Sequence, residues 1–239
     1  MKASIKYYQY SKSSWGKRRG ALIFRQIKNL QSEKILKLDN LNIIELGCGV
    51  CTVSKKFITK NNKIIAVDKN LEMLVLVKNS RINLVNYDVL DFLKKNKKKF
   101  DLIICNNIIE YITDKERFMG LLNKAVKKNS ILSLVVINLN YEVLKRFRNN
   151  EWRAGISLLR TRKYYSNNFK CSFNLKSIEE WKIFLNRFGW KIVNWHGVGL
   201  IDSDLYKDSH KGMDYELELL KKSPYRDQAV LTHFVCKIM

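Results

Sequence analysis

The chain has 239 residues, of which 46% are hydrophobic, 11% aromatic and 28% charged, a composition typical of globular proteins rather than disordered or collagen-like ones. Its five cysteines are an odd number and widely scattered, which favours a reduced, cytoplasmic protein over a secreted one held by disulfides. The first ten residues lack an apolar signal core, and no stretch is long and apolar enough to span a bilayer. We therefore expect neither export nor membrane insertion.

The charge of the chain is strongly positive and uneven. It carries 45 Lys and Arg against 22 Asp and Glu, a net charge of +23. Residues 1–39 carry +8 and residues 145–170 carry +7, whereas residues 171–239 carry only +1. A genome rich in Lys, Asn and Ile codons would raise the total, but it would not spare one third of the chain. We therefore interpret part of the excess positive charge as serving to bind a phosphate-rich partner.

Between residues 20 and 138, short apolar runs alternate with amphipathic segments of helix length. The runs predict strands at 42–46, 63–67, 82–87, 100–105 and 131–137, and the segments predict helices at about 20–38, 51–60, 70–80 and 115–128. Runs that are apolar on both faces and joined by helices indicate a parallel sheet covered on both sides. The pattern predicts a doubly wound, Rossmann-like α/β fold.

The pattern changes after residue 138. Residues 141–176 are basic and aromatic without strand alternation, and we expect an inserted cap or loop there. A helix is predicted over 177–188, with acidic residues in its first turn and Gly189 as its stop. Strands at 189–193 and 229–236 would complete a mostly parallel sheet of about seven strands. We interpret residues 1–239 as a single domain: a basic N-terminal arm and helix (1–39), a cofactor-binding core (40–140), the cap (141–176), and a C-terminal helix with antiparallel strands (177–239).

Four features fall at the carboxyl ends of predicted strands, where open α/β sheets bind their ligands. Gly47 and Gly49 follow the first strand and permit a tight turn close to a ligand. Asp68 ends the second strand, where a carboxylate can accept hydrogen bonds from two ribose hydroxyls. The third strand leads to Asp88 and the fourth to Asn106. Together these features predict a nucleoside-binding site at this edge of the sheet.

The glycine loop departs from the pattern that binds a pyrophosphate, because Cys51 stands at the third small position and Glu45 precedes the turn. An acid there suits a cofactor with ammonium and sulfonium charges. The motifs at 45–49, 68, 88–89 and 100–104 together resemble the class I S-adenosylmethionine-dependent methyltransferases over roughly residues 40–140. The resemblance implies S-adenosyl-L-methionine as cofactor, with contacts at Arg25, Glu45, Gly47, Cys48, Gly49, Asp68, Asp88, Val89, Leu90 and Asn106.

The flanking segments resemble the bacterial tRNA 5-carboxymethoxyuridine methyltransferases. The similar motifs lie at 15–20, 138, 188–192, 197–198 and 223–226. That family methylates the carboxylate of a modified wobble uridine, so the likeness implies the tRNA anticodon loop as partner and Arg19, Arg153 and Arg226 as candidates for orienting the carboxylate. The chain departs from the family at Ile23, which replaces an arginine and leaves Arg19 or Arg25 to take over its role. Gly199 and residues 128–130 are further departures.

A carboxylate substrate is already ionised at neutral pH, so we expect no general base and no catalytic dyad. Cys48 and Cys51 lack two further ligands, so we expect no metal. Two other functions stay open: methyl transfer to a small metabolite, such as a quinone precursor or an acyl carboxylate, and a non-catalytic RNA-binding module. Binding of RNA would weaken with salt, whereas small-molecule binding would not. The oligomeric state is not predicted.

Overall fold

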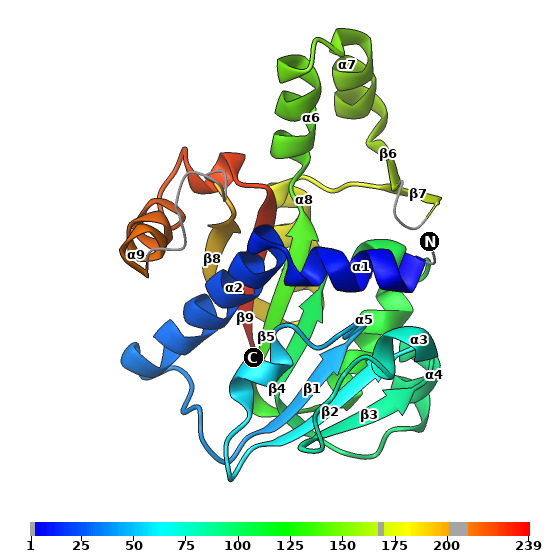
Figure 1. The fold of residues 1–239 in the computed structure, drawn as a ribbon, viewed down its shortest axis with the longest axis vertical. Helices are drawn as coiled ribbons and strands as arrows, with labels where there is room; N and C mark the ends of the chain where they lie inside the picture. Colours follow the sequence, from blue (N-terminus) through cyan, green and yellow to red (C-terminus); the bar gives the residue numbers. More distant parts are fainter. Residues whose placement is uncertain (1–2, 167–169, 201–209) are drawn as a thin grey trace.

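A twisted seven-stranded sheet forms the centre of the protein in the computed structural model, which describes residues 3–166, 170–200 and 210–239 (Figure 1). Its strands follow the order β3-β2-β1-β4-β5-β9-β8. They are β1 (Asn42–Leu46), β2 (Lys63–Asp68), β3 (Ile82–Asn86), β4 (Phe100–Asn106), β5 (Val126–Ile137), β8 (Trp190–Val198) and β9 (Leu231–Ile238). The first five strands run parallel, and β9 runs antiparallel to both β5 and β8. The predicted mostly parallel seven-stranded α/β sheet is confirmed.

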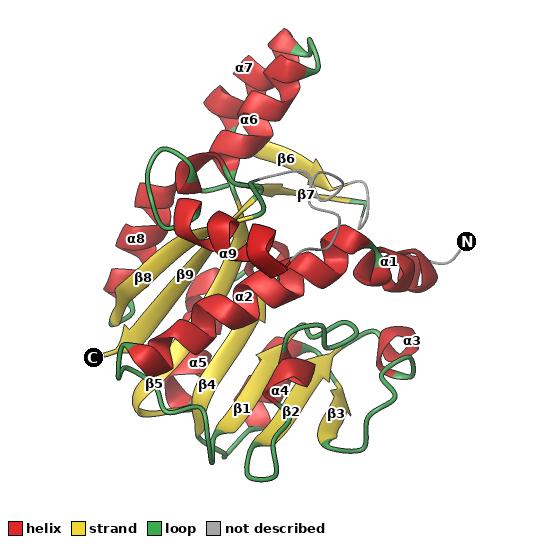
Figure 2. Ribbon diagram, turned by 60° about the vertical axis from the view of Figure 1, so that its left-hand side comes forward, coloured by secondary structure: helices red, strands yellow, loops and turns green. Residues whose placement is uncertain are grey.

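Helices cover both faces of this sheet through apolar stripes. On one face, α2 (Ser14–Ser32) buries Leu22, Ile27 and Leu30 against the strands, together with η1 (Ser54–Phe57) and α3 (Leu71–Leu74). The other face carries α4 (Val89–Lys95), α5 (Lys115–Lys124) and α8 (Ile178–Arg187). Figure 2 shows α2 lying across the front of the strands with α5 and α8 behind them. Since all five parallel strands end at one edge, the loops after them gather there.

The N-terminal residues form two consecutive helices. α1 (Ala3–Lys12) is followed by Ser13, whose side chain accepts a hydrogen bond from the backbone N–H of Gly16 at 3.2 Å and so caps α2. α2 therefore begins before the predicted start near residue 20. Farther along, Arg18 pairs with the fully buried Glu216 of α9 (His210–Leu219), which fixes α9 against α2.

The segment predicted as a cap or loop contains regular structure. It forms α6 (Leu139–Arg148), α7 (Trp152–Thr161) and a hairpin of β6 (Lys163–Ser166) and β7 (Cys171–Asn174). Leu139, Val143, Leu158 and Leu175 form an apolar cluster of their own. These residues pack on one another and meet the sheet through Ile137 at the end of β5, and α6 and α7 project above the carboxyl edge (Figure 1).

Three predicted helices are wrong in length. The segments expected to be helical at 51–60 and 70–80 contain only η1 and α3, of four residues each. The helix expected at 115–128 stops at Lys124, and β5 begins at Val126 because the N–H of Phe100 donates to the carbonyl of Ala125 at 2.9 Å. Pairing with β4 thus overrides the local helical pattern. The short helix η4 (Arg226–Gln228) precedes β9. None of the helices in the described ranges is long and apolar enough to cross a membrane.

Candidate functional site

The loop after β1 turns sharply at its two glycines. Gly47 has φ +64° and Gly49 has φ +53°, in the left-handed region that glycine adopts at no steric cost. A Cβ on Gly47 would lie 2.1 Å from Cδ1 of Ile108, so the loop after β4 also requires a glycine here. Between them, the N–H of Cys48 donates to the carbonyl of Val67 at 3.0 Å and ties the loop to β2.

Asp68 joins this loop to the end of β2. Its Oδ2 accepts a hydrogen bond from the N–H of Gly49 at 2.7 Å, and its Oδ1 accepts one from the N–H of Asn70 at 2.9 Å. The structure therefore brings together the glycine loop and the acid that were predicted to share one site. A carboxylate has further acceptor capacity beyond these two bonds, which leaves room for hydroxyl donors of a ligand.

Glu45 and Arg19 form the buried floor of the site. Glu45 is 3% exposed, and its Oε2 accepts a hydrogen bond from the N–H of Ser54 at 3.3 Å. Burial raises the pKa of Glu45 to about 7, although hydrogen bonding from Ser54 and the nearby Arg19 oppose the shift. Arg19 is 9% exposed and donates to the Tyr7 hydroxyl at 3.3 Å. A guanidinium held this close to the loop suits a ligand carboxylate.

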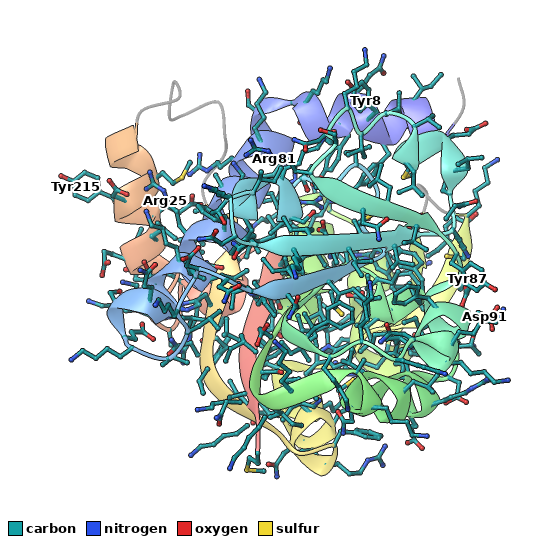
Figure 3. The ribbon with its side chains drawn as sticks, turned by 90° about the horizontal axis from the view of Figure 1, so that it is seen from below. Tyr8, Arg25, Arg81, Tyr87, Asp91 and Tyr215 are labelled. Carbon is teal, nitrogen blue, oxygen red and sulfur yellow. The ribbon has the colours of Figure 1, made fainter. Side chains whose placement is uncertain are left out.

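Arg25, the other arginine considered for that role, lies elsewhere. It forms an ion pair with Asp214 of α9 and is partly exposed. Figure 3 shows Arg25 on the same side as Tyr215, away from the end of the sheet where Tyr87 and Asp91 lie. Of the two candidates, the structure puts Arg19 and not Arg25 beside Glu45.

The ends of β3 and β4 supply the remaining predicted positions. Asp88 caps α4, its Oδ1 accepting a hydrogen bond from the N–H of Leu90 at 2.8 Å, and Val89 beside it is buried. At the end of β4, both amide atoms of Asn106 are buried and have no hydrogen-bond partner among the described residues, and neither has Oδ1 of Asn107. Buried amides without partners are costly, so they indicate a place where a ligand completes the hydrogen bonding.

A second buried carboxylate lies one turn beyond this strand, on η2 (Ile109–Tyr111). Oε1 of Glu110 accepts a hydrogen bond from the N–H of Ile137 at 2.6 Å, while Oε2 is buried without a partner in the part of the chain described. Burial raises the pKa of Glu110 to about 7, and the Ile137 hydrogen bond opposes the shift. No role was predicted for Glu110 from the sequence. Its one signal there is an acidic residue inside an otherwise apolar run, Ile108 to Ile112.

The β6–β7 hairpin packs on Tyr111, the residue next to this second carboxylate. The ring of Tyr111 packs against Phe173 with centroids 5.0 Å apart, and its hydroxyl lies 3.5 Å from Oγ of Ser166. Tyr164 packs on Phe173 in turn, at 5.4 Å. Tyr111 of η2 and the hairpin residues Phe173 and Tyr164 thus form an aromatic cluster close to Glu110.

The other two positioning candidates lie away from the glycine loop. Arg153 is exposed on α7. The guanidinium of Arg226 stacks 3.9 Å from the ring centre of Trp195 on β8, at the far end of the sheet from β1 and β2, and its Nη1 donates to the carbonyl of Lys221 at 3.2 Å. Within the described residues, Arg226 contacts Trp195, Lys221 and Asp227 rather than Asp68.

The two cysteines of the loop region are both buried. A hydrogen bond with Cys51 and burial raise the pKa of the Cys48 thiol. Across residues 3–166, 170–200 and 210–239, no group of three or more His, Cys, Asp or Glu side chains is placed to hold a metal ion.

Comparison with known proteins agrees with this arrangement. A family model described as "Methyltransferase domain" matches residues 37–189. A curated relative, the ubiquinone biosynthesis O-methyltransferase of Pelagibacter ubique, is 28% identical over 120 residues, which cover 48% of this chain and 49% of that protein. The chain thus spans about half the length of that relative.

Two solved structures share the fold over nearly the whole chain. The plantazolicin methyltransferase BamL, solved with a substrate analogue and S-adenosylhomocysteine, superposes with a TM-score of 0.63 at 14% identity, covering 99% of this chain and 89% of its own. A SAM-dependent methyltransferase from Archaeoglobus fulgidus gives a TM-score of 0.61 at 15% identity, covering 97% of this chain and 99% of its own.

Proposed function

The chain belongs to the methyltransferase domain family, and from that premise we propose that it transfers a methyl group from S-adenosylmethionine to an oxygen atom of a small molecule. The observation that carries the proposal is the hydrogen bond from Gly49 to Asp68, which builds a cradle at the ends of β1 and β2. The amide of Asn106 at the end of β4 finds no partner in the part of the chain described, and this supports the proposal because a bound cofactor would supply the missing partners.

The residues present suit each part of this cofactor. Gly47 and Gly49 let a ligand approach the backbone, and Asp68 can accept hydrogen bonds from ribose hydroxyls. Arg19 offers a cation to the carboxylate of the methionine moiety, and Glu45 offers a buried carboxyl group to its ammonium, whose positive charge would favour the ionised form. When bound, S-adenosylmethionine supplies an electrophilic methyl group on a sulfonium.

The properties of Glu110 favour a substrate whose nucleophilic oxygen must lose a proton. A phenol or alcohol is neutral at pH 7, so its methylation benefits from a base, and a base works best when its pKa lies near the working pH. One buried oxygen of Glu110 has no hydrogen-bond partner among the described residues, and burial raises the pKa of this group to about 7. The aromatic side chains of the cap beside it suit a flat, apolar substrate. We propose that Glu110 accepts the proton of the substrate hydroxyl.

The second candidate is methylation of a tRNA carboxylate, which the net charge of +23 and the flanking motifs favour. An enzyme of that kind would need no base, and its rate would depend on phosphate contacts. Methylation of tRNA would then fall with salt at a log-log slope of about −0.7 per phosphate contact, whereas methylation of a neutral phenol would not.

One experiment separates the two candidates. Purified protein is incubated with methyl-labelled S-adenosylmethionine and, in parallel reactions, with a set of catechols and hydroxyquinols or with total tRNA, and products are identified by mass spectrometry. The proposal expects a methyl ether of a phenol and no labelled nucleoside. Label found in tRNA alone would replace it with the second candidate, and no label in either would refute both.

A further inference from the structure

A basic pocket of about 310 Å³ lies beside the glycine loop, between the two N-terminal helices and the residues after β1. Its walls carry Lys12, Lys17, Lys55, Lys56 and Lys78, and we call it the lysine pocket. These residues come from α1, from α2, from η1 and from the turn after α3, so four separate segments of the fold converge on one cavity.

The positive charge of the lysine pocket is not neutralised within the described part of the chain. No Asp or Glu lines it, and among the described residues the ion pairs formed by lysines belong to Lys127, Lys182 and Lys221, none of which lines the pocket. The ammonium group of Lys12 lies 4.2 Å from the ring centre of Tyr8. Lys12, Lys17, Lys56 and Lys78 are exposed and Lys55 is half-buried, so water and salt screen much of their mutual repulsion, and a bound anion would offset the rest.

The position of the lysine pocket separates it from the cofactor cradle. Val50 and Thr52 line it, directly after Gly49, and Gly16 at the start of α2 forms part of the opposite wall. Tyr8 also lines it from α1, which lies along the top of Figure 3 where Tyr8 is labelled. An occupant would connect the N-terminal helices to the loop after β1 while leaving Asp68 and Asn106 to the cofactor.

The side chains that line the lysine pocket are suited to bind phosphate groups. Lysine ammonium groups bind phosphate oxygens as point charges, and the Thr52 hydroxyl adds a neutral donor. The volume is about ten times the space of one water molecule, which is more than a single phosphate needs. We infer that the lysine pocket binds a ligand with two or more adjacent phosphate groups. Such groups occur in a free polyphosphate and in the backbone of an RNA strand, and S-adenosylmethionine has none.

The test uses the full chain without cofactor, so that it does not depend on the proposed methyl transfer. Binding of tripolyphosphate is measured by calorimetry, and binding of a short fluorescent single-stranded RNA by anisotropy over a series of salt concentrations. The variant Lys17→Gln/Lys56→Gln removes two charges from the pocket. The matched control Lys94→Gln/Lys97→Gln removes two exposed charges from the end of α4 and the turn after it. Thermal unfolding shows whether both variants are folded.

We expect the pocket variant to bind tripolyphosphate about tenfold more weakly than the wild type, and the control to bind within about twofold of it. If RNA is the source of the phosphates, the pocket variant also lowers the salt slope for RNA by about 1.4, the value for two lost contacts to a single strand. Binding of tripolyphosphate without that change in slope assigns the pocket to a small phosphorylated ligand. Equal losses in both variants, or no saturable binding of either probe, overturn the inference.

Discussion

Replacement of Asp68 by alanine tests the cofactor cradle directly. The carboxylate accepts hydrogen bonds from Gly49 and Asn70, and both donors lose their partner in Asp68→Ala. The site is partly exposed, so water can replace part of what is lost, and we expect the free energy of unfolding to fall by about 1–2 kcal/mol.

The effect on the cofactor is larger. Each ribose hydroxyl bound to a carboxylate contributes roughly 1.5–3 kcal/mol, so loss of two such bonds predicts at least a hundredfold weaker binding. Calorimetric titration with S-adenosylhomocysteine measures this, since the product shares the ribose. Asp91→Ala serves as the control, because Asp91 is an exposed acid on α4 and its loss changes the charge equally (Figure 3). If both variants bound the product within about threefold of the wild type, the cradle would not be the cofactor site.

The same geometry gives three further predictions. Gly47→Ala places a side chain at φ +64° against Ile108 and should lower the free energy of unfolding by about 2–3 kcal/mol. Gly120→Ala on α5 puts its methyl group in open space and should raise that free energy by up to about 1 kcal/mol, both measured by chemical denaturation. Burial raises the pKa of Glu110 in the folded state, so its contribution to stability falls as pH rises from 4.5 to about 7. Relative to the wild type, Glu110→Gln should therefore gain up to roughly 3 kcal/mol in free energy of unfolding across that pH range. A difference between the two proteins that does not change with pH would contradict the burial argument. Arg19→Met should weaken S-adenosylhomocysteine binding about tenfold or more while Arg25→Met leaves it unchanged, and equal losses in titration would refute the role of Arg19.

The strands and their ends were predictable because two local signals coincide there. The runs that form β1, β2 and β4 are apolar on both faces, and a glycine, an acid or an amide follows each of them. The carboxyl ends of neighbouring parallel strands must meet at one edge, so Gly49 and Asp68 could be placed together from the sequence alone. Their hydrogen bond at 2.7 Å shows how closely they meet.

The ends of the helices, the choice between Arg19 and Arg25, and the role of Glu110 could not be predicted in the same way. The boundary between α5 and β5 depends on a bond from Phe100, 25 residues away from Ala125 along the chain, which no local window contains. Arg19 and Arg25 lie within two helical turns of each other, and only the position of α9 decides that Arg25 pairs with Asp214. Glu110 follows the fourth strand end in the sequence, but no role could be given to it because the hydrogen bond that orients it comes from Ile137 at the end of β5, 27 residues away.

The position of β9 has a consequence for how the protein is made. β9 is the strand that joins β5 to β8, and Phe234, Val235 and Cys236 within it are fully buried. During synthesis the five parallel strands can pair as they emerge, but β8 has no neighbour until β9 follows it. For that interval two sheet edges stay open, and open edges invite pairing with other chains. A ribosome that stops before β9 would therefore release a product prone to aggregation, even though every residue of the cofactor cradle had already been translated.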